Sequence, residues 1–423
     1  MKVPGITTHV DEPRDRSPDS TLMLLNDGYG FLLKRLRRYQ QDVFETRLLG
    51  ERVICLHGPE AARVFYDPER FGRSHAAPSR VEKTLFGRGG VQGLDGAAHE
   101  RRKAMFMQLM TDDRINDLVT LFERAWRSVL PRWESSDRVV LFEEAQELLC
   151  RAVCTWSGVP LHDDEVPRRA LDMAAMVDAF GAVGPRHWRG RSARRRSEGW
   201  ISGIVADVRT GDRAADEASA LHTIAFHRDS DGEFLDTRVA AVELLNVIRP
   251  VVAISWYIAF IGVALHDCPE WKERVRSGGD GEVERFVHEV RRFYPLAPFV
   301  GARVRQSFDW GGHRFDEGTL VILDVFGTHR DARLWDRPGE FDPDRFRGWT
   351  SDGYDLIPQG GGDHHRDHRC AGEWITVAVM KAATQLLCDA IEYDVGRQDL
   401  AFSLNRIPTA PKSGVVLERI RRR

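Results

Sequence analysis

Cysteine is scarce in this chain and shows no disulfide pattern. The 423 residues include six cysteines, scattered at Cys55, Cys150, Cys154, Cys268, Cys370 and Cys388. The opening Met1–Gly5 shows no apolar core of the kind that defines a secretory signal. Scattered cysteines without such a signal are typical of free thiols in a reducing compartment, so we expect a cytoplasmic protein. Cys150 and Cys154, one helical turn apart, are interpreted as small core side chains.

An excess of charge of either sign is also missing. Lysine and arginine total 61 against 64 acidic residues, which gives a formal net charge of -3. This balance gives no reason to expect a nucleic acid partner. Basic residues do cluster at Arg186–Arg196 and at Arg421–Arg423. We interpret both clusters as solvated faces, with an anionic membrane surface or an acidic partner as the alternative.

Long apolar runs are limited to one, Leu244–Leu265, and polar residues interrupt its first third. Asn246, Arg249 and Pro250 lie there, and an arginine inside a membrane span costs at least about 2.5–3.5 kcal/mol. We therefore expect no transmembrane segment and interpret the run as a buried helix.

The remaining sequence is mainly helical in its periodicity. Thr111 is a predicted cap, and the apolar residues that follow it to Leu130 are three and four positions apart. Further helices are expected at 140–157, 237–266, 281–294 and 373–391. Strands are expected at 52–56, 308–310, 313–315 and 320–323, with a hairpin turn at Gly311-Gly312. Surface loops are expected at 209–218 and 277–281.

The segment Pro358–Trp374, PQGGGDHHRDHRCAGEW, joins three glycines to a cysteine at the start of a predicted helix. Gly360–Gly362 permit positive φ and a close approach to something flat and bulky. Cys370 precedes Gly372 and a helix beginning near Glu373, where the dipole and free N–H groups favour a thiolate. Cys370 is therefore a candidate iron ligand.

Two other interpretations of this segment stay open at this point. Cys370 could be an inert buried thiol. Alternatively, the segment could bind zinc through Asp363, His364, His365, His368 and Cys370. The spacing alone does not decide between them.

Three motifs in order carry a resemblance to the cytochrome P450 superfamily along nearly the whole chain. They are Glu289–Arg292 (EVRR), Glu340–Phe346 (EFDPDRF) and the Cys370 loop. The resemblance implies the P450 fold, mainly α with small marginal β-sheets, as one haem domain over residues 1–423. It also implies haem b with a thiolate-ligated iron held by Cys370. Glu289, Arg292 and Arg345 would form a buried network, in which losing one partner costs about 3–5 kcal/mol.

Other segments resemble the fatty-acid peroxygenase branch, whose members use hydrogen peroxide directly. They are Asn246–Ser255, the GGGDHH…HRC loop, Phe293–Pro295 and Val91–Gly96. Ordinary P450s place an acid followed by threonine in the long helix, to move protons to bound oxygen. This chain has Arg249-Pro250 there.

The Arg249-Pro250 pair has physical consequences of its own. Pro250 removes a backbone hydrogen bond and is expected to kink the helix. A buried unpaired guanidinium is costly, so an anion should accompany Arg249. Glu243 is six residues away on the wrong face, which favours a ligand carboxylate that fits the guanidinium fork. The alternative is a salt bridge to a distant Asp or Glu.

The resemblance implies a long-chain fatty acid and hydrogen peroxide as substrates, with no obligatory redox partner. The carboxylate held by Arg249 would move the peroxide proton that ordinary members move with an acid. Oxidation would then fall on the nearby α or β carbon. Gln92 takes the place of a histidine found in alkene-forming decarboxylases, which favours hydroxylation. Arg249, Pro250 and Gln92 are thus the expected catalytic positions.

The resemblance implies weaker assignments as well. His99, Lys103 and Arg73 match haem-propionate contacts, although His99–Lys103 could be an exposed basic face. Gly362 and Gly372 are expected beside the haem. The substrate pocket would be lined by Leu85, Phe86, Pro298 and Phe299, which could equally be ordinary core.

The chain also departs from the branch. Ala371 replaces the usual proline after the ligand cysteine. Pro298–Val300 resembles β-hydroxylating members, whereas Gly90–Leu94 and Arg151–Cys154 resemble α-hydroxylating ones, so the regiochemistry stays open. Competing hypotheses are a conventional monooxygenase, a decarboxylase forming terminal alkenes, a non-catalytic haem or lipid carrier, and a zinc protein.

Overall fold

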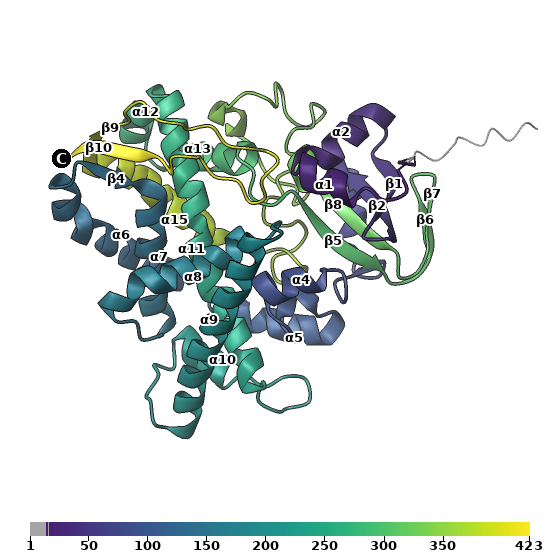
Figure 1. Ribbon diagram of the computed structural model, residues 1–423, viewed down its shortest axis with the longest axis horizontal. Coiled ribbons are helices and arrows are strands. Elements are labelled where there is room, and N and C mark those ends of the chain that lie inside the picture. Colours follow the sequence, from purple (N-terminus) through teal and green to yellow (C-terminus); the bar gives the residue numbers. More distant parts are fainter. Residues whose placement is uncertain (1–13, 16) are drawn as a thin grey trace, which may run out of the picture.

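The computed structural model describes residues 14–15 and 17–423, so Met1–Gly5, examined above for a signal, lies outside the described residues. A large helical part surrounds α11 (Thr237–Asp267), and a smaller β-rich part lies at one side of it (Figure 1). This is the predicted mainly helical fold with small sheets at its margin.

The helices before α11 are α1 (Thr21–Asp27), α2 (Gly30–Tyr39), α3 (Gly58–Phe65), α4 (Ser79–Val81), α5 (Gly96–Met107), α6 (Asp112–Glu134), α7 (Leu141–Ser157), α8 (Val166–Asp178), α9 (Pro185–Thr210) and α10 (Ala220–Ala225). Those after it are α12 (Glu270–Gly278), α13 (Asp280–Phe293), α14 (Val325–Thr328) and α15 (Glu373–Gln385). The helices predicted near 111–130, 140–157, 237–266, 281–294 and 373–391 are confirmed as α6, α7, α11, α13 and α15 with its continuation Leu386–Ala390.

The long apolar helix α11 forms the centre of the helical part and packs against α7, α8, α9 and α15. It is long and apolar enough to cross a membrane, but 89% of its most apolar window is buried inside the protein. Its apolar surface is thus covered by neighbouring helices, as expected for a core helix. The helix continues through Pro250 as a single element.

The strands are β1 (Val43–Leu48), β2 (Glu51–His57), β3 (Phe71–Gly72), β4 (Arg138–Val140), β5 (Phe299–Val304), β6 (Phe308–Trp310), β7 (His313–Phe315), β8 (Leu320–Asp324), β9 (Ile391–Asp394) and β10 (Val416–Arg422). They form sheets in the orders β1-β2-β8-β5-β3, β4-β10-β9 and β6-β7. The predicted strands are confirmed as β2, β6, β7 and β8. The predicted hairpin turn is also confirmed, because Gly311 and Gly312 have φ of 60° and 78°.

Both predicted surface loops are shorter than expected. Residues 209 and 210 complete the last turn of α9, and the chain leaves the helix at Gly211. Around 277–281 the break is reduced to Gly279, which has a φ of 66° and separates α12 from α13. A single glycine at positive φ is enough to end a helix, so the polar composition overstated the loop length.

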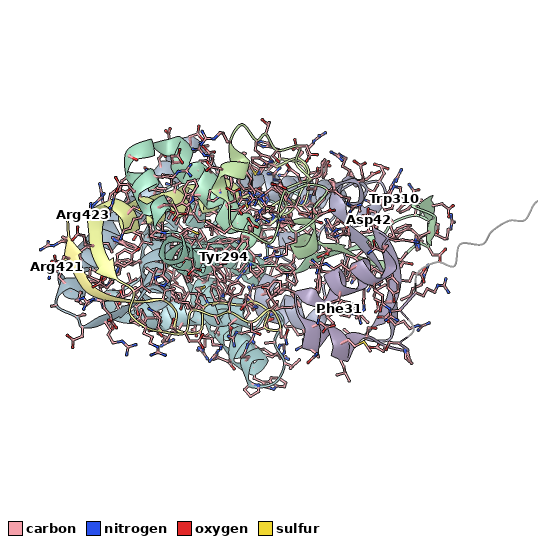
Figure 2. All side chains as sticks on the ribbon, turned by 90° about the horizontal axis from the view of Figure 1, so that it is seen from above. Phe31, Asp42, Tyr294, Trp310, Arg421 and Arg423 are labelled. Atoms are coloured by element: carbon pink, nitrogen blue, oxygen red, sulfur yellow. The ribbon has the colours of Figure 1, made fainter. Side chains whose placement is uncertain are left out.

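The two basic clusters differ in their environment. Arg421 and Arg423 lie at one edge of the molecule, at the opposite end from Trp310 of β6 (Figure 2). Within Arg186–Arg196, Arg189 and Arg195 are exposed, but Arg194 is buried and pairs with Glu198 at 2.7 Å. The interpretation as a solvated face is therefore wrong for Arg194.

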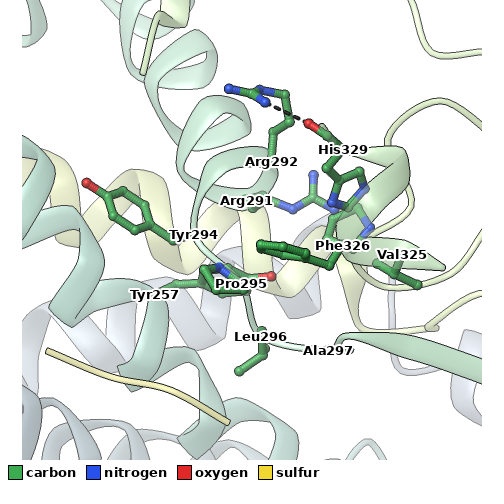
Figure 3. A pocket seen from close by; sticks show the side chains of 11 residues that line it. Tyr257, Arg291, Arg292, Tyr294, Pro295, Leu296, Ala297, Val325, Phe326 and His329 are labelled. Carbon is green, nitrogen blue, oxygen red and sulfur yellow. Dashed lines mark hydrogen bonds between the residues drawn. The ribbon is translucent and has the colours of Figure 1, made fainter. Parts of the chain in front are cut away.

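A buried ion network connects α13 to the segment that follows α14. Arg292 binds both oxygens of Glu289, at 2.6 and 2.7 Å, and Arg345 Nε lies 3.2 Å from the same carboxylate. The Asp342 N–H donates to Glu289 at 2.8 Å, and Arg292 donates to the His329 carbonyl at 2.7 Å (Figure 3). Glu289 and Arg292 are 0% and 1% exposed, so each charge relies on these partners.

Replacing Glu289 by Ala would leave both arginines buried without a counter-ion. We expect Glu289→Ala to lower the free energy of unfolding by about 3–5 kcal/mol. Glu284→Ala, at an exposed site of the same helix, is the control and should change it by less than about 0.5 kcal/mol. Thermal melting of both variants checks this, and equal losses would contradict the assignment.

A histidine connects the end of β2 to the end of β8. His57 Nδ1 lies 3.2 Å from Asp324, its register partner, and Nε2 lies 3.3 Å from Asp331. Burial by itself would lower the pKa of His57, but the two carboxylates outweigh it and raise that pKa to about 9. The charged imidazolium is therefore the form that the fold stabilises.

The stability due to His57 should depend on pH. Because the pKa is raised on folding, this contribution is complete below pH 6.5 and is lost as the pH rises through about 9. We expect a loss of up to about 3 kcal/mol between pH 6 and pH 10, beyond that of His57→Gln. Melting curves of the wild type, His57→Gln and the exposed-site control His162→Gln test this. Parallel curves for wild type and His57→Gln would rule it out.

Candidate functional site

Arg249 places a positive charge in the middle of the apolar core. Its side chain belongs to α11 and is only 6% exposed. Nη2 donates to Asn246 Oδ1 at 3.3 Å, whereas the buried Nε has no hydrogen-bond partner. Within residues 14–15 and 17–423, no carboxylate forms an ion pair with Arg249, so the alternative of a distant internal salt bridge is not supported there. Burial, followed by repulsion from Arg194, lowers the pKa of Arg249 to about 9.

Glu243, the one acid that the sequence placed near Arg249 along the helix, has other partners. It is 0% exposed and accepts from Arg102 Nη1 at 2.6 Å and from the Val91 N–H at 2.8 Å. Its second oxygen accepts from Asn246 Nδ2 at 2.9 Å. Asn246 Nδ2 also lies 3.2 Å from Gln92 Oε1, which brings Gln92 to the same end of the site as Arg249.

Cys370 lies just before α15 in a loop that folds back on itself. The Cys370 N–H donates to the Gln359 carbonyl at 2.9 Å, and Gln359 Nε2 lies 3.9 Å from the sulfur. Gly360 and Gly362 have φ of 96° and 84°. At Gly361 a Cβ would come within 2.8 Å of the Gly353 carbonyl. The glycines are therefore required by the tight loop.

The pKa of Cys370 does not agree with the thiolate that the sequence predicted at this helix terminus. Burial raises the pKa of this thiol, and Glu373 adds to the shift. The Gly372 N–H, Lys103 and Gln359 oppose it without outweighing burial. The helix terminus alone therefore does not keep a thiolate here, and an additional positive charge at the sulfur is needed.

A second buried charge network surrounds the first residue of α15. Glu373 pairs with Arg291, with Arg369 at 2.7 Å and with His364 at 3.0 Å. These contacts hold the pKa of Glu373 well below its usual range in spite of burial. Arg291 also donates to Gln359 Oε1 at 3.2 Å. Gln359, whose amide lies beside the Cys370 sulfur, is thus held by an arginine of this ion network.

The zinc interpretation is contradicted over the part of the chain that the structure describes, where no three His, Cys, Asp or Glu side chains could hold a metal ion together. His364 pairs with Glu373 and stacks on Trp374, with 4.7 Å between the ring centroids. His368 stacks instead on His99 of α5 at 3.8 Å. His364 and His368 therefore point to different partners.

A group of buried basic side chains lies against the Cys370 loop. His99 and Lys103 are 5% and 3% exposed, so the alternative of an exposed basic face is wrong for these two. Lys103 Nζ donates to the carbonyls of Asp367, at 3.2 Å, and Arg369. Arg73 donates to the Gly301 carbonyl at 2.8 Å. Burial lowers the pKa of His99 to about 3 and also lowers that of Lys103.

The expected pocket residues fall into two clusters. Leu85 and Phe86 pack with Trp256, Ala253 and Leu296. Phe299 begins β5 and packs instead against the cluster of the β1-β2 region, and the carbonyl of buried Pro298 accepts the N–H groups of Val325 and Phe326.

Several residues around the site were given no site role from the sequence. They are Asn246, Arg194, Gln359, Glu373, Leu296 and Ala253. Ala253 could have been found from its position one turn after Arg249. The small pocket in Figure 3, between Tyr257 and His329, holds only about 10 Å³ and is too small for more than one water.

Comparison with known proteins places this geometry in a family. The family model for cytochrome P450 matches residues 283–404. Cytochrome P450 137 of Mycobacterium tuberculosis is 22% identical over 365 residues, which cover 80% of this chain and 75% of that protein.

Solved structures are more similar. Wild-type cytochrome P450EX alpha (CYP152N1) with myristic acid is 45% identical with a TM-score of 0.94, covering 97% of this chain and 99% of that one. Cytochrome P450SP alpha (CYP152B1) with (R)-ibuprofen is 47% identical with a TM-score of 0.93, covering 96% and 99%. A variant of cytochrome P450 OleT with arachidonic acid is 36% identical with a TM-score of 0.95, covering 97% and 99%.

These relatives share the fold over nearly the whole chain. Identities of 36–47% over nearly complete chains exceed what a shared fold alone would give. The chain therefore belongs to the cytochrome P450 superfamily, in its fatty-acid peroxygenase branch, as an oxidoreductase with a thiolate-ligated haem.

Proposed function

We propose that this protein hydroxylates long-chain fatty acids at the α or β carbon with hydrogen peroxide, and that Arg249 binds the substrate carboxylate. One observation carries the proposal: Arg249 is 6% exposed and forms no ion pair with any acid of the described residues. The nearby acids Glu243 and Glu198 are paired with Arg102 and Arg194 instead. A buried guanidinium without a counter-ion favours the binding of an anion.

The residues around Cys370 fit a haem. Among the described residues, the basic side chains Arg73, His99, Lys103 and His368 form one salt bridge, from His368 to Asp95 at 3.7 Å. Lys103 and Arg73 donate to backbone carbonyls, so their charges suit the two propionates. With haem bound, a Cys370 thiolate supplies electron density that favours cleavage of an O–O bond.

The proton chemistry explains why peroxide is the proposed oxidant. Breaking the O–O bond of peroxide requires a proton to move from one oxygen to the other, which is general acid–base work. α11 carries Arg249-Pro250 at the place of an acid–threonine pair, and its one buried acid, Glu243, is held by Arg102. A carboxylate bound to Arg249 would be the available base. Gln92 lies beside Asn246, the hydrogen-bond partner of Arg249.

The ligands of similar proteins support a carboxylate at this position. Myristic acid, arachidonic acid and (R)-ibuprofen, bound in the three similar structures, each carry one carboxyl group. An anchored carboxylate would hold the α and β carbons nearest to it, and the alkyl chain would contact Leu85 and Phe86. We further propose a single haem domain over residues 1–423 that acts in the cytoplasm without a redox partner.

Cys370 is expected to be the iron ligand. Cys370→Ser should therefore abolish the absorbance near 450 nm of the reduced carbon monoxide complex, because that band requires a thiolate on iron. Cys268→Ser, which changes a half-buried thiol after α11, should keep the band. A Cys370→Ser protein that kept it would exclude Cys370 as the ligand.

Arg249 is expected to be essential for turnover. With myristic acid and peroxide alone, Arg249→Ala should lose at least about 30-fold in kcat/KM, since breaking a buried charge pair costs about 2–5 kcal/mol. Arg195→Ala, at an exposed site on α9, should keep the wild-type value.

Gas chromatography–mass spectrometry of the products measures both the rate and the position of the hydroxyl group. Wild-type turnover by Arg249→Ala would refute the carboxylate anchor. If the wild-type enzyme formed no product despite a normal thiolate spectrum, the peroxide-dependent function would be wrong.

A further inference from the structure

Asn246 lies one helical turn before Arg249, on the same face of α11. Over residues 14–15 and 17–423, it is the only side chain to which Arg249 donates a hydrogen bond, from Nη2 to Oδ1 at 3.3 Å. We infer that Asn246 is a positioning residue for Arg249, and that the buried Glu243–Arg102 pair fixes the orientation of its amide. The inference rests on the proposed function, because the role assigned to Asn246 is in carboxylate binding.

The orientation of the Asn246 amide follows from its neighbours. Nδ2 lies 2.9 Å from Glu243 Oε2 and 3.2 Å from Gln92 Oε1, both of which are acceptors. A guanidinium has donors only, so the side toward Arg249 must present an acceptor. A flipped amide would face two acceptors with its oxygen and a donor with its NH₂ group. Only the observed orientation satisfies all three contacts.

Glu243 holds that orientation because it is itself immobilised. The side chain is 0% exposed, and its other oxygen accepts from Arg102 Nη1 at 2.6 Å and from the Val91 N–H at 2.8 Å. Arg102 in turn pairs with Asp229 at 2.6 Å. The same carboxylate thus positions the segment that carries Gln92 and, through Asn246, the guanidinium of Arg249.

The neutrality of Asn246 is as important as its geometry. An amide oxygen directs a guanidinium without neutralising its charge. Among the described residues, the two acids near the site already have other cations, buried Glu243 with Arg102 and half-buried Glu198 with Arg194 at 2.7 Å. The Arg249 guanidinium is therefore oriented by Asn246 but keeps its full positive charge for a ligand. A carboxylate at position 246 would neutralise that charge.

The substitution Asn246→Asp tests this with almost no change in shape. The carboxylate that it introduces would give Arg249 an internal counter-ion that competes with the fatty acid. For haem-loaded protein at pH 8, we expect the Kd for myristic acid to rise at least about tenfold. The Kd for 1-tetradecanol, which has the same chain and no carboxylate, should change by less than about twofold. Isothermal titration calorimetry measures both.

Two further variants complete the test. Asn246→Leu removes the acceptor without adding charge, and a lost hydrogen bond of about 0.5–1.5 kcal/mol should weaken myristic acid binding by about two- to tenfold. Asn116→Asp adds the same charge at an exposed site of α6 and should bind like wild type. The 450 nm band and the melting temperature check that each variant is folded, and the Leu variant carries the test if the Asp variant is not.

The outcomes separate this inference from the function on which it rests. If wild type binds myristic acid no better than 1-tetradecanol, or if Arg249→Ala keeps that preference, both the carboxylate anchor and the role of Asn246 are wrong. If the preference exists and depends on Arg249, but both Asn246 variants bind myristic acid like wild type, only the role of Asn246 is overturned.

Discussion

The burial of a positive charge at Arg249, which has no carboxylate partner among the described residues, is the constraint on which the proposed site depends. Arg249 lies in a largely apolar helix at the centre of the protein, and burial lowers its pKa to about 9. An anion bound to Arg249 would lower the cost of burying this charge, and this is the physical basis of the proposed preference for carboxylates. The neighbouring acids do not cancel it, because each is closer to a different arginine.

The opposite side of the site depends on two adjacent arginines of α13. Successive helical residues point about 100° apart, so Arg291 and Arg292 face different parts of the protein. Arg291 reaches Glu373 and Gln359 in the loop that carries Cys370. Arg292 reaches Glu289 and the backbone of residues 329–340. One helix thus supports the cysteine loop directly and the segment behind it, and both contacts are buried.

Much of this could be predicted from the sequence, and the limits have physical causes. The long helices were predictable because α6, α7, α13 and α15 show apolar residues at helical spacing, and because α11 is a long apolar run that is buried on nearly every side. β10 was not, since it pairs with β4, which lies far away in the chain. β1 was missed although its partner β2 follows it directly. Arg249 was identifiable because an arginine in an apolar run needs an explanation. Arg194 was not, because it lies among exposed arginines and its burial comes from packing on α11. Asn246 was visible in the motif, but its role depends on which way its amide faces, and that is set by Glu243 and Gln92.

A charged residue beside the proposed carboxylate site also holds the segment proposed as one wall for the alkyl chain. Arg194, which repels Arg249, donates to the carbonyls of Leu85 and Phe86 at 2.9 and 3.4 Å. At Gly87, which has a φ of 83°, a Cβ would approach Arg194 and Val242 to within 1.9 and 2.6 Å. The segment before Gly87 is therefore pressed against α9 and α11 as closely as a glycine permits. In the proposed site, the position of the apolar wall would therefore be coupled through Arg194 to Arg249, which would bind the substrate carboxylate.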